Sequence, residues 1–289
     1  MSHLLCFGLG FTGKALARGL AVRGWQVTGT SRSRAGADAI AALGYRGLVF
    51  DAAVALPVKV LAGVSHVVIS VPPDNVGDPV LRQHGTGLAA LAAQFAWVGY
   101  LSTTGVYGDQ GGGWVTEDSA LAPSTERGGR RLKAEAAWLE LHAQQRLPVH
   151  IFRLAGIYGP GRNQLASMLD GTARRIVKPG QVFSRIHVED AAAVLEASMA
   201  KPNPGAAYNV CDDEPAPPQV VVAHAAALLG MAVPPEIAFE QAELSPMARS
   251  FYAESKRVSN SRIKRELAVR LRFPSYREGL AALLKDVKR

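Results

Sequence analysis

The chain has 289 residues and a formal net charge of +8 at pH 7, which is enough length for one large α/β domain with a smaller lobe. No apolar stretch reaches the roughly twenty residues of a membrane span, and the short N-terminal apolar run leads into a glycine motif rather than a signal-peptide pattern. The positive charge is not arranged as a basic run interleaved with aromatic residues, which argues against a nucleic-acid partner.

The first thirty residues predict a cofactor loop. The glycine spacing G-x-G-x-x-G occurs at Gly8, Gly10 and Gly13, with Phe11 and Thr12 inside it. The flanking predicted elements are a strand, a helix and a second strand, over residues 4–7, 14–23 and 25–30. In this context the first glycine permits the tight turn, the second lets the backbone approach a pyrophosphate, and the third lets helix and strand pack closely. We therefore assign these five residues to dinucleotide binding; the alternative is an ordinary glycine-rich turn.

The end of the second strand predicts which dinucleotide is preferred. Sites for NAD usually place an acidic residue here to bind the ribose hydroxyls. This chain instead has Ser31 and Arg32, a hydroxyl and a guanidinium that suit a 2′-phosphate. We expect NADP(H) to be preferred over NAD(H); the alternative is a solvated basic loop.

Strands and helices then alternate, which predicts an α/β fold with a Rossmann-type, doubly wound parallel sheet. The further strands are expected over residues 48–51, 66–71, 97–102 and 149–154, and the intervening helices over residues 81–96 and 130–146. Asp51 and Ser70 lie at the ends of the third and fourth strands and are assigned to the cofactor as well.

After residue 154 the pattern becomes turn-rich, and residues 174–185 are basic and irregular. The later expected elements are a strand over residues 207–210 and helices over residues 219–229, 262–267 and 276–288. We expect residues 1–155 to form the NADP-binding domain, with later strands contributed from about residues 180–212. Residues 156–289 are expected to form a smaller, mostly helical substrate-binding lobe, interleaved with it.

Four later segments resemble the extended short-chain dehydrogenase/reductase superfamily of NAD(P)-dependent epimerases and dehydratases. They are L-S-T-T-G-V-Y-G at 101–108, R-L-A-G-I-Y-G-P-G at 153–161, I-H-V-E-D at 186–190 and Y-N-V at 208–210. The resemblance implies an oxidoreductase-type fold and places Thr103 at the catalytic Ser/Thr position. The glycine spacing departs from the G-x-x-G-x-x-G of most extended members and indicates an atypical branch. From the residues alone, His187 is interpreted as structural, and Glu189 and Asp190 as a helix cap and dipole partners.

The family's Y-x-x-x-K pair is missing. Glu135 matches the glutamate that follows the lysine by four residues, which places Arg131 at the lysine position and Arg127 at the tyrosine position. Lys133 cannot replace the lysine, because two residues correspond to about 200° of helix rotation. Tyr107 and Tyr158 are the nearest alternative proton donors. With Arg162, the arginines at positions 127 and 131 are assigned to an anionic substrate.

Two functions stay open from the sequence. One is an NADP-dependent epimerase, dehydratase or reductase acting on an unidentified anionic or nucleotide-sugar-like small molecule with an altered acid/base group. The other is a non-catalytic NADP(H)-binding protein that senses redox state. The two cysteines, Cys6 and Cys211, lack metal-ligand spacing and indicate a cytoplasmic protein without a metal site. The apolar positions of the helix over residues 130–146 predict a homodimer.

Overall fold

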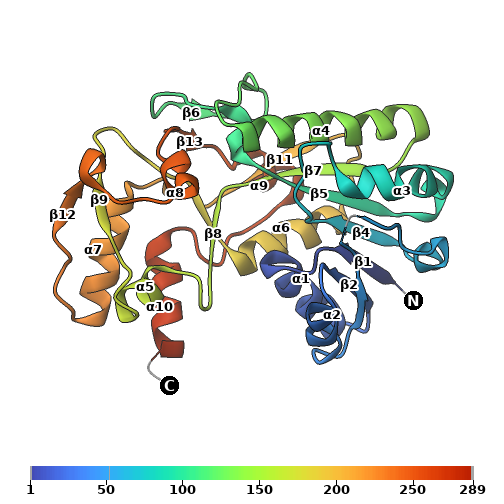
Figure 1. Cartoon of the computed structure of the whole chain (residues 1–289), viewed down its shortest axis with the longest axis horizontal. Coiled ribbons are helices and arrows are strands. Elements are labelled where there is room, and N and C mark those ends of the chain that lie inside the picture. The colour runs from blue at the N-terminus through green and yellow to red at the C-terminus, as the bar shows by residue number, and fades with distance from the viewer. Residues whose placement is uncertain (1, 52, 288–289) are drawn as a thin grey trace. The chain divides into compact units, whose positions relative to one another are not determined.

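Seven strands form the central sheet, in the order β11-β7-β5-β4-β1-β2-β3 (Figure 1). The computed structural model describes residues 2–51 and 53–287. The pairings from β3 through β2, β1 and β4 to β5 are all parallel. The strands are β1 (His3–Phe7), β2 (Gln26–Ser31), β3 (Arg46–Val49), β4 (His66–Ile69), β5 (Trp97–Thr103), β7 (Val149–Leu154) and β11 (Ala207–Val210).

Helices cover both faces of this sheet, as the predicted doubly wound α/β fold requires. The helices are α1 (Phe11–Val22), α2 (Arg34–Ala41), α3 (Pro79–Ala90), α4 (Glu126–Gln145) and α6 (Val188–Ala200), with 3-10 turns at Val58–Leu61, Ala92–Gln94 and Thr104–Tyr107. In Figure 1, α1 and α6 lie on one face and α3 and α4 on the other. Arg23, the C-cap residue of α1, pairs with Glu196 of α6 at 2.7 Å. The Trp138 indole N–H of α4 donates to Asp78, the N-cap of α3, at 3.2 Å. The fold class is therefore confirmed.

The chain divides into two compact units. The first, called the sheet unit, comprises Met1–Thr103, Gly129–Arg153 and Ala192–Tyr208, and the second unit comprises Thr104–Gly128, Leu154–Ala191 and Asn209–Arg289. The assignment of cofactor to residues 1–155 and of substrate to residues 156–289 stays a prediction. No helix among the described residues is both long and apolar enough to cross a membrane.

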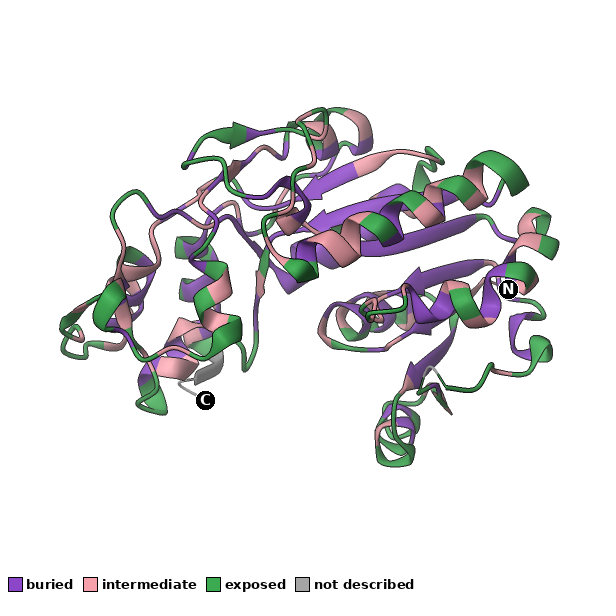
Figure 2. Cartoon of the chain, turned by 45° about the horizontal axis from the view of Figure 1, so that its top comes forward, coloured by how far each residue is buried: buried purple, intermediate pink, exposed green. Residues whose placement is uncertain are grey.

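The core of the sheet unit consists of the strands themselves. Figure 2 shows the central strands as almost continuously buried, and both β4 and β7 are buried at every position. Leu5, Val67, Val98 and Ile151, one from each of four neighbouring strands, join Trp138 of α4 in one apolar cluster. Strands buried on both faces lose their alternation and read as continuous apolar runs, which is why the sequence identified them.

The second unit contains small parallel strand pairs and short helices. The pairs are β6 (Trp114–Val115) with β13 (Arg257–Val258), β8 (Gly156–Tyr158) with β10 (Arg185–His187), and β9 (Arg175–Val177) with β12 (Glu236–Ala238). The helices are α5 (Gln164–Leu169), α7 (Pro218–Leu229), α8 (Pro246–Phe251), α9 (Ser261–Leu267) and α10 (Tyr276–Val287), with a 3-10 turn at Phe239–Gln241. Apolar residues of α5, α7 and α10 pack together around Leu165, Val221 and Leu280.

Several predicted boundaries differ from the structure. Helix α1 begins at Phe11 and α4 at Glu126, so Arg127 lies in the first turn of α4. The helix expected over residues 81–96 ends at Ala90. The basic stretch 174–185, expected to be irregular, contains β9 and the start of β10. Lys288, the expected end of the last helix, lies outside the described residues. The missed strands have three residues each, too few for a periodic pattern.

Two adjacent glycines, Gly128 and Gly129, test how closely the first turn of α4 packs against the backbone at Gly105. A Cβ on Gly128 would lie 2.7 Å from the Gly105 carbonyl oxygen, whereas a Cβ on Gly129 would meet nothing within 4 Å. We expect Gly129→Ala to stabilise the fold by about 0.5–1 kcal/mol through helix propensity, and Gly128→Ala to destabilise it by about 1–3 kcal/mol through overpacking. Urea unfolding of both variants measures the difference, and equal shifts would contradict the close contact.

Candidate functional site

The glycine loop is fixed between β1 and β2 by Thr30. The Gly8 N–H donates to the Thr30 hydroxyl at 2.8 Å, and the Leu9 N–H donates to the Thr30 carbonyl at 2.9 Å. Gly8 has φ +83°, a left-handed conformation that disfavours a side chain. The sequence predicted the loop but gave no signal for Thr30, whose contacts depend on the pairing of β1 with β2.

The other two glycines have different physical reasons. A Cβ on Gly13 would lie 2.9 Å from the Cys6 sulfur, so this glycine lets α1 approach β1, as the sequence predicts. A Cβ on Gly10 would find its nearest neighbour only at 4.0 Å. A steric clash within the protein therefore does not explain why position 10 lacks a side chain. Close approach of a bound ligand to the Gly10 backbone would explain it. Gly10 is also the N-cap of α1, where no side chain caps the helix and no acidic residue lies in the first turn. This N-terminus suits an anion.

The end of β2 leaves one arginine uncommitted. Ser33 caps α2 by accepting from the Gly36 N–H at 3.2 Å, and Arg34 pairs with Asp38 at 3.0 Å. Arg32 is exposed and makes no hydrogen bond or ion pair with the described residues. Ser31 is half-buried, and its hydroxyl lies against the first turn of α2, where a Cβ on Gly36 would meet it.

Two more predicted cofactor residues lie at the ends of neighbouring strands. Ser70 follows β4, is half-buried, and donates its N–H to the Phe7 carbonyl at 2.9 Å, which places it beside the start of the glycine loop. Asp51 follows β3 and is exposed, and its carboxylate accepts from the Ala53 N–H at 2.9 Å. Gly8, Ser31 and Ser70 thus lie at the carboxyl ends of three adjacent strands, the edge at which open α/β sheets bind ligands.

Thr103, the last residue of β5, follows a buried polar network that sequence reasoning missed. The Ser102 hydroxyl donates to the Glu135 carboxylate, and the Arg153 guanidinium pairs with the same carboxylate at 2.9 Å. All three side chains are buried. Glu135 was a landmark of the family motif only, and its link to Ser102 and Arg153 joins α4 to β5 and β7. The position of Thr103 therefore depends on charges held inside the sheet unit.

Arg131 is attached to the same strand. Its Nη1 donates to the Leu101 carbonyl at 2.7 Å and to the Tyr100 hydroxyl at 3.2 Å, and its guanidinium carbon lies 5.6 Å from the centre of the Tyr100 ring. The residue at the family's lysine position thus holds the backbone of β5 in this chain.

The two candidate tyrosines have interior positions in the second unit. Tyr107 is fully buried, and its hydroxyl donates to the Asn209 side-chain oxygen at 2.7 Å. Tyr158 is buried as well, with its hydroxyl 3.3 Å from the Ser275 carbonyl and its ring against Gly279. Burial, and then the charges of Asp212 and Asp190, raise the pKa of the Tyr158 phenol. Both side chains pack and bond internally here, and their assignment to catalysis stays a prediction.

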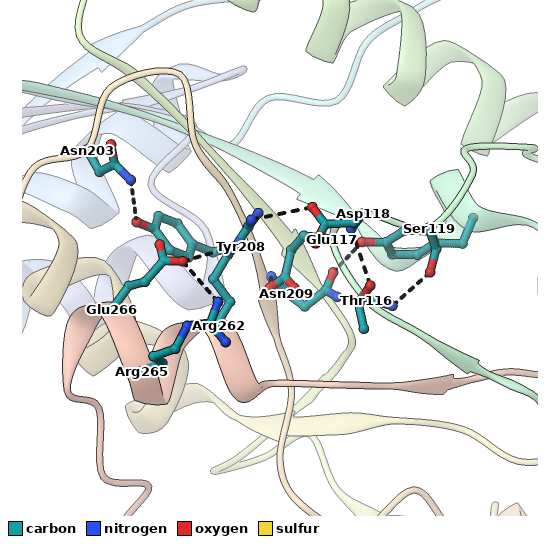
Figure 3. A network of polar contacts seen from close by, with 11 residues as sticks. Thr116, Glu117, Asp118, Ser119, Asn203, Tyr208, Asn209, Arg262, Arg265 and Glu266 are labelled. Carbon is teal, nitrogen blue, oxygen red and sulfur yellow. Dashed lines mark hydrogen bonds and ion pairs between the residues drawn. The ribbon is translucent and has the colours of Figure 1, made fainter.

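Asn209 connects Tyr107 to the loop that follows β6. The Glu117 carboxylate accepts from the Asn209 backbone N–H at 2.8 Å (Figure 3). Arg262 of α9 pairs with Asp118, the next residue of that loop, at 3.4 Å. These contacts fix the segment that follows Thr103 within the second unit, and nothing in the sequence spacing predicted them.

The remaining predicted residues of the second unit take separate positions. The Arg127 guanidinium lies 4.3 Å from the centre of the Phe251 ring, and both side chains are exposed. Arg162 is exposed in the loop after β8, where its backbone bonds with Gly159. No described contact brings these two arginines together. Among the described residues, no three His, Cys, Asp or Glu side chains form a group that could hold a metal ion.

The I-H-V-E-D segment at residues 186–190 makes internal packing and hydrogen-bond contacts. The His187 ring packs 4.1 Å from the Phe273 ring and 5.2 Å from the Tyr158 ring. Glu189 and Asp190 lie in the first turn of α6, which suits the helix dipole. The interpretation of Asp190 as a cap is wrong, because its carboxylate accepts from the backbone N–H groups of Arg272 and Phe273, at 2.7 and 2.9 Å. It attaches the C-terminal segment to α6.

Asp212 is a titratable group that the sequence did not indicate. Only 1% of it is exposed, and one carboxylate oxygen has no hydrogen-bond partner among the described residues. Burial raises the pKa of this carboxyl to about 8, although the Arg185 charge acts in the opposite direction. Arg185 is itself buried and donates to the carbonyls of Phe183 and Ala216.

Comparison with known proteins agrees with the fold. The model of the NAD-dependent epimerase/dehydratase family matches residues 86–211. The Escherichia coli K12 protein YeeZ is 30% identical over 244 residues, which are 81% of this chain and 86% of YeeZ.

Two solved structures extend the comparison. A functionally unknown conserved protein from Silicibacter pomeroyi DSS is 54% identical, with a TM-score of 0.92 and 100% of each chain covered. The UDP-glucuronic acid 4-epimerase of Bacillus cereus, in complex with UDP-glucuronic acid and NAD, is 18% identical, with a TM-score of 0.77 and 99% of each chain covered. The second likeness concerns the fold alone.

Asp212 predicts an unusual dependence of stability on pH. A carboxyl that titrates near 3.9 in the unfolded chain and near 8 in the folded chain keeps its proton in the folded state, so stability falls as pH rises towards 8. The fall is at most about 1.4 kcal/mol per pH unit. Burial also lowers the pKa of several histidines, to about 4 for His66, His150 and His187. They act in the opposite direction, and because the unfolded imidazole titrates near 6.5, their effect fades only above about pH 7.5.

Comparison with Asp212→Asn isolates this carboxyl between pH 6.5 and 8, because both proteins contain the same histidines. Thermal unfolding should show that the unmodified chain loses stability with rising pH more steeply than Asp212→Asn across this window. Asp213→Asn, which changes the neighbouring exposed carboxylate, is the matched control and should keep the slope. An unchanged slope in Asp212→Asn would show that this carboxyl is already ionised.

Proposed function

The chain belongs to the NAD-dependent epimerase/dehydratase family, and on that premise we propose that it binds NADP(H) and acts as an oxidoreductase-type enzyme on an anionic or nucleotide-sugar-like small molecule. The observation that carries this proposal is the glycine loop. Its turn is held by Thr30, its second glycine has open space, and the N-terminus of α1 is uncapped. These features suit a pyrophosphate bound to backbone N–H groups.

The preference for NADP(H) is supported by the groups at the end of β2. Arg32 is exposed and uncommitted, whereas Arg34 is paired with Asp38. A 2′-phosphate beside Arg32 and Ser31 would gain charge-assisted hydrogen bonds. The solved epimerase of Bacillus cereus contains NAD. The proposed preference for NADP(H) therefore rests on Ser31 and Arg32 of this chain and not on the likeness to that epimerase.

The proposed chemistry separates hydride transfer from proton transfer. NADP(H), when bound, would supply or accept the hydride. The Thr103 hydroxyl, at the family's Ser/Thr position, would hold the reacting oxygen. Arg127 and Arg131 cannot act as bases, because guanidinium groups stay protonated in proteins, and with Arg162 they would favour an anionic ligand. Tyr107 and Tyr158 would have to leave their internal hydrogen bonds before either could exchange a proton. We therefore expect slow turnover.

The second candidate function is a non-catalytic NADP(H)-binding redox sensor. The specific observation that favours it is the attachment of Arg131 to β5, because the residue at the lysine position then has a structural task. A screen of NADPH oxidation against a panel of carbonyl compounds and nucleotide sugars separates the two functions. Turnover that Thr103→Ala reduces supports an enzyme, and tight NADPH binding without turnover supports a sensor.

We also propose a cytoplasmic homodimer. Cys6 and Cys211 are both buried and unpaired as free thiols, which fits a reducing compartment. On α4, the partly or fully exposed apolar positions Leu132, Ala136, Leu139 and Ala143 recur at helical spacing and could serve an interface. Light scattering at micromolar concentration distinguishes the dimer from a monomer.

The cofactor preference is directly measurable. Fluorescence titration should show that NADPH binds about ten- to a hundredfold more tightly than NADH. This difference in affinity corresponds to the free energy of about 1.5–3 kcal/mol that hydrogen bonds to charged groups contribute. Arg32→Ala should remove most of this difference by weakening NADPH alone. Arg34→Ala is the matched control. It removes the same charge two residues further along the chain, from a side chain that is already paired with Asp38, and it should keep the preference for NADPH. Equal affinities for the two cofactors would refute the assignment.

A further inference from the structure

The guanidinium of Arg131 is fixed at one corner and open along one edge. Its Nη1 is bound to the Leu101 carbonyl and the Tyr100 hydroxyl. Its Nε and Nη2 make no hydrogen bond with the described residues. Arg131 is half-buried, and neither Nε nor Nη2 is a buried atom without a hydrogen-bond partner. Because neither atom has a partner in the described chain, neither atom is fully buried. Nε and Nη2 are therefore reachable by solvent or by a ligand.

This open edge has a specific chemistry. The N–H groups of Nε and Nη2 are nearly parallel and match the two oxygens of a planar carboxylate, which gives a bidentate pair. The attachment of Nη1 to β5 already restricts the side chain, so a ligand would pay less ordering entropy than it would with a mobile surface arginine. A lysine, a point charge without such a fork, could not offer the same recognition.

The charges around Arg131 leave its positive charge available. Glu135, one turn further along α4, is taken up by Arg153 and Ser102. Asp78 acts on Arg131 electrostatically, but its carboxylate caps α3 and accepts from the Trp138 indole. Arg131 has no ion-pair partner among the described residues. Thr103 follows Leu101 by two residues, about 7 Å along β5, so one small ligand could reach both side chains.

We propose that the Nε–Nη2 edge of Arg131 binds a carboxylate group of the ligand beside Thr103. This inference rests on the proposed function, because it names the substrate class of that site. The residue at the lysine position then recognises a carboxylate instead of taking part in proton transfer.

The test uses oxalate as the probe and the full chain saturated with NADPH, followed by isothermal titration calorimetry. The unmodified chain should bind oxalate, and Arg131→Met should bind it about ten- to a hundredfold more weakly, as expected for a lost charge-assisted pair. Arg131→Lys should recover only part of the loss. Lys133→Met removes one exposed positive charge from the same helix, about 200° away, and should bind oxalate normally.

Several results would overturn the proposal. They are undetectable oxalate binding by the unmodified chain, unchanged binding in Arg131→Met, an equal loss in Lys133→Met, or inorganic phosphate binding as tightly as oxalate. Thermal unfolding checks the fold of each variant, and if Arg131→Met does not fold, Arg131→Lys and Thr103→Val decide, each with an expected loss of affinity. If NADPH fails to bind, the proposed function fails, and oxalate titrated into the chain without cofactor still tests Arg131.

Discussion

The buried carboxylate of Glu135 is the constraint on which the sheet unit depends. It lies between the Ser102 hydroxyl and the Arg153 guanidinium, so one side chain of α4 joins β5 to β7. Removing one partner of such a buried pair typically costs about 3–5 kcal/mol, because the other charge is left uncompensated. Few other arrangements of these three elements would satisfy all the groups. The end of β5, and with it Thr103, is therefore held in one position by electrostatics as much as by apolar packing.

The same helix shows how the fold can persist while its chemistry changes. In the family motif this helix supplies a tyrosine and a lysine for proton transfer, and the sequence prediction assigns these positions to Arg127 and Arg131. Arg131 has not become a solvated surface charge, because Nη1 is bound to the backbone of β5. The helix keeps its structural link through Glu135 and acquires a second link through Arg131. Two side chains of α4 therefore hold the end of β5, Glu135 through the Ser102 hydroxyl and Arg131 through the Leu101 carbonyl.

The sequence predicted features that depend on neighbouring residues and missed those that depend on distant ones. The buried strands and the close packing at Gly13 follow from local spacing, and the structure confirms them. The partners of Glu135 are Ser102 and Arg153, separated from it by 33 and 18 positions, and no spacing rule links them. Asp190 was misread for the same reason, because its partners lie 82 and 83 residues further on. The hydrogen-bond acceptor of the Tyr107 hydroxyl, Asn209, lies 102 residues further along the chain.

An enzyme and a redox sensor on this fold would both bind the cofactor, and they would differ in whether a group can supply a proton. In the sheet unit the residues that suit a dinucleotide are open, with Gly10 unobstructed and Arg32 uncommitted. In the second unit the candidate proton donors are occupied, since the Tyr107 and Tyr158 hydroxyls donate to internal acceptors. Burial raises the pKa of the Tyr158 phenol and so makes it a weaker acid. The interior position of Tyr158 therefore opposes catalysis in two ways, because it limits access to the hydroxyl and lowers its acidity. An enzyme built on this chain must therefore take its proton from a group other than these two phenols, such as water. A ligand carboxylate held by Arg131 would be ionised and could accept a proton but not supply one.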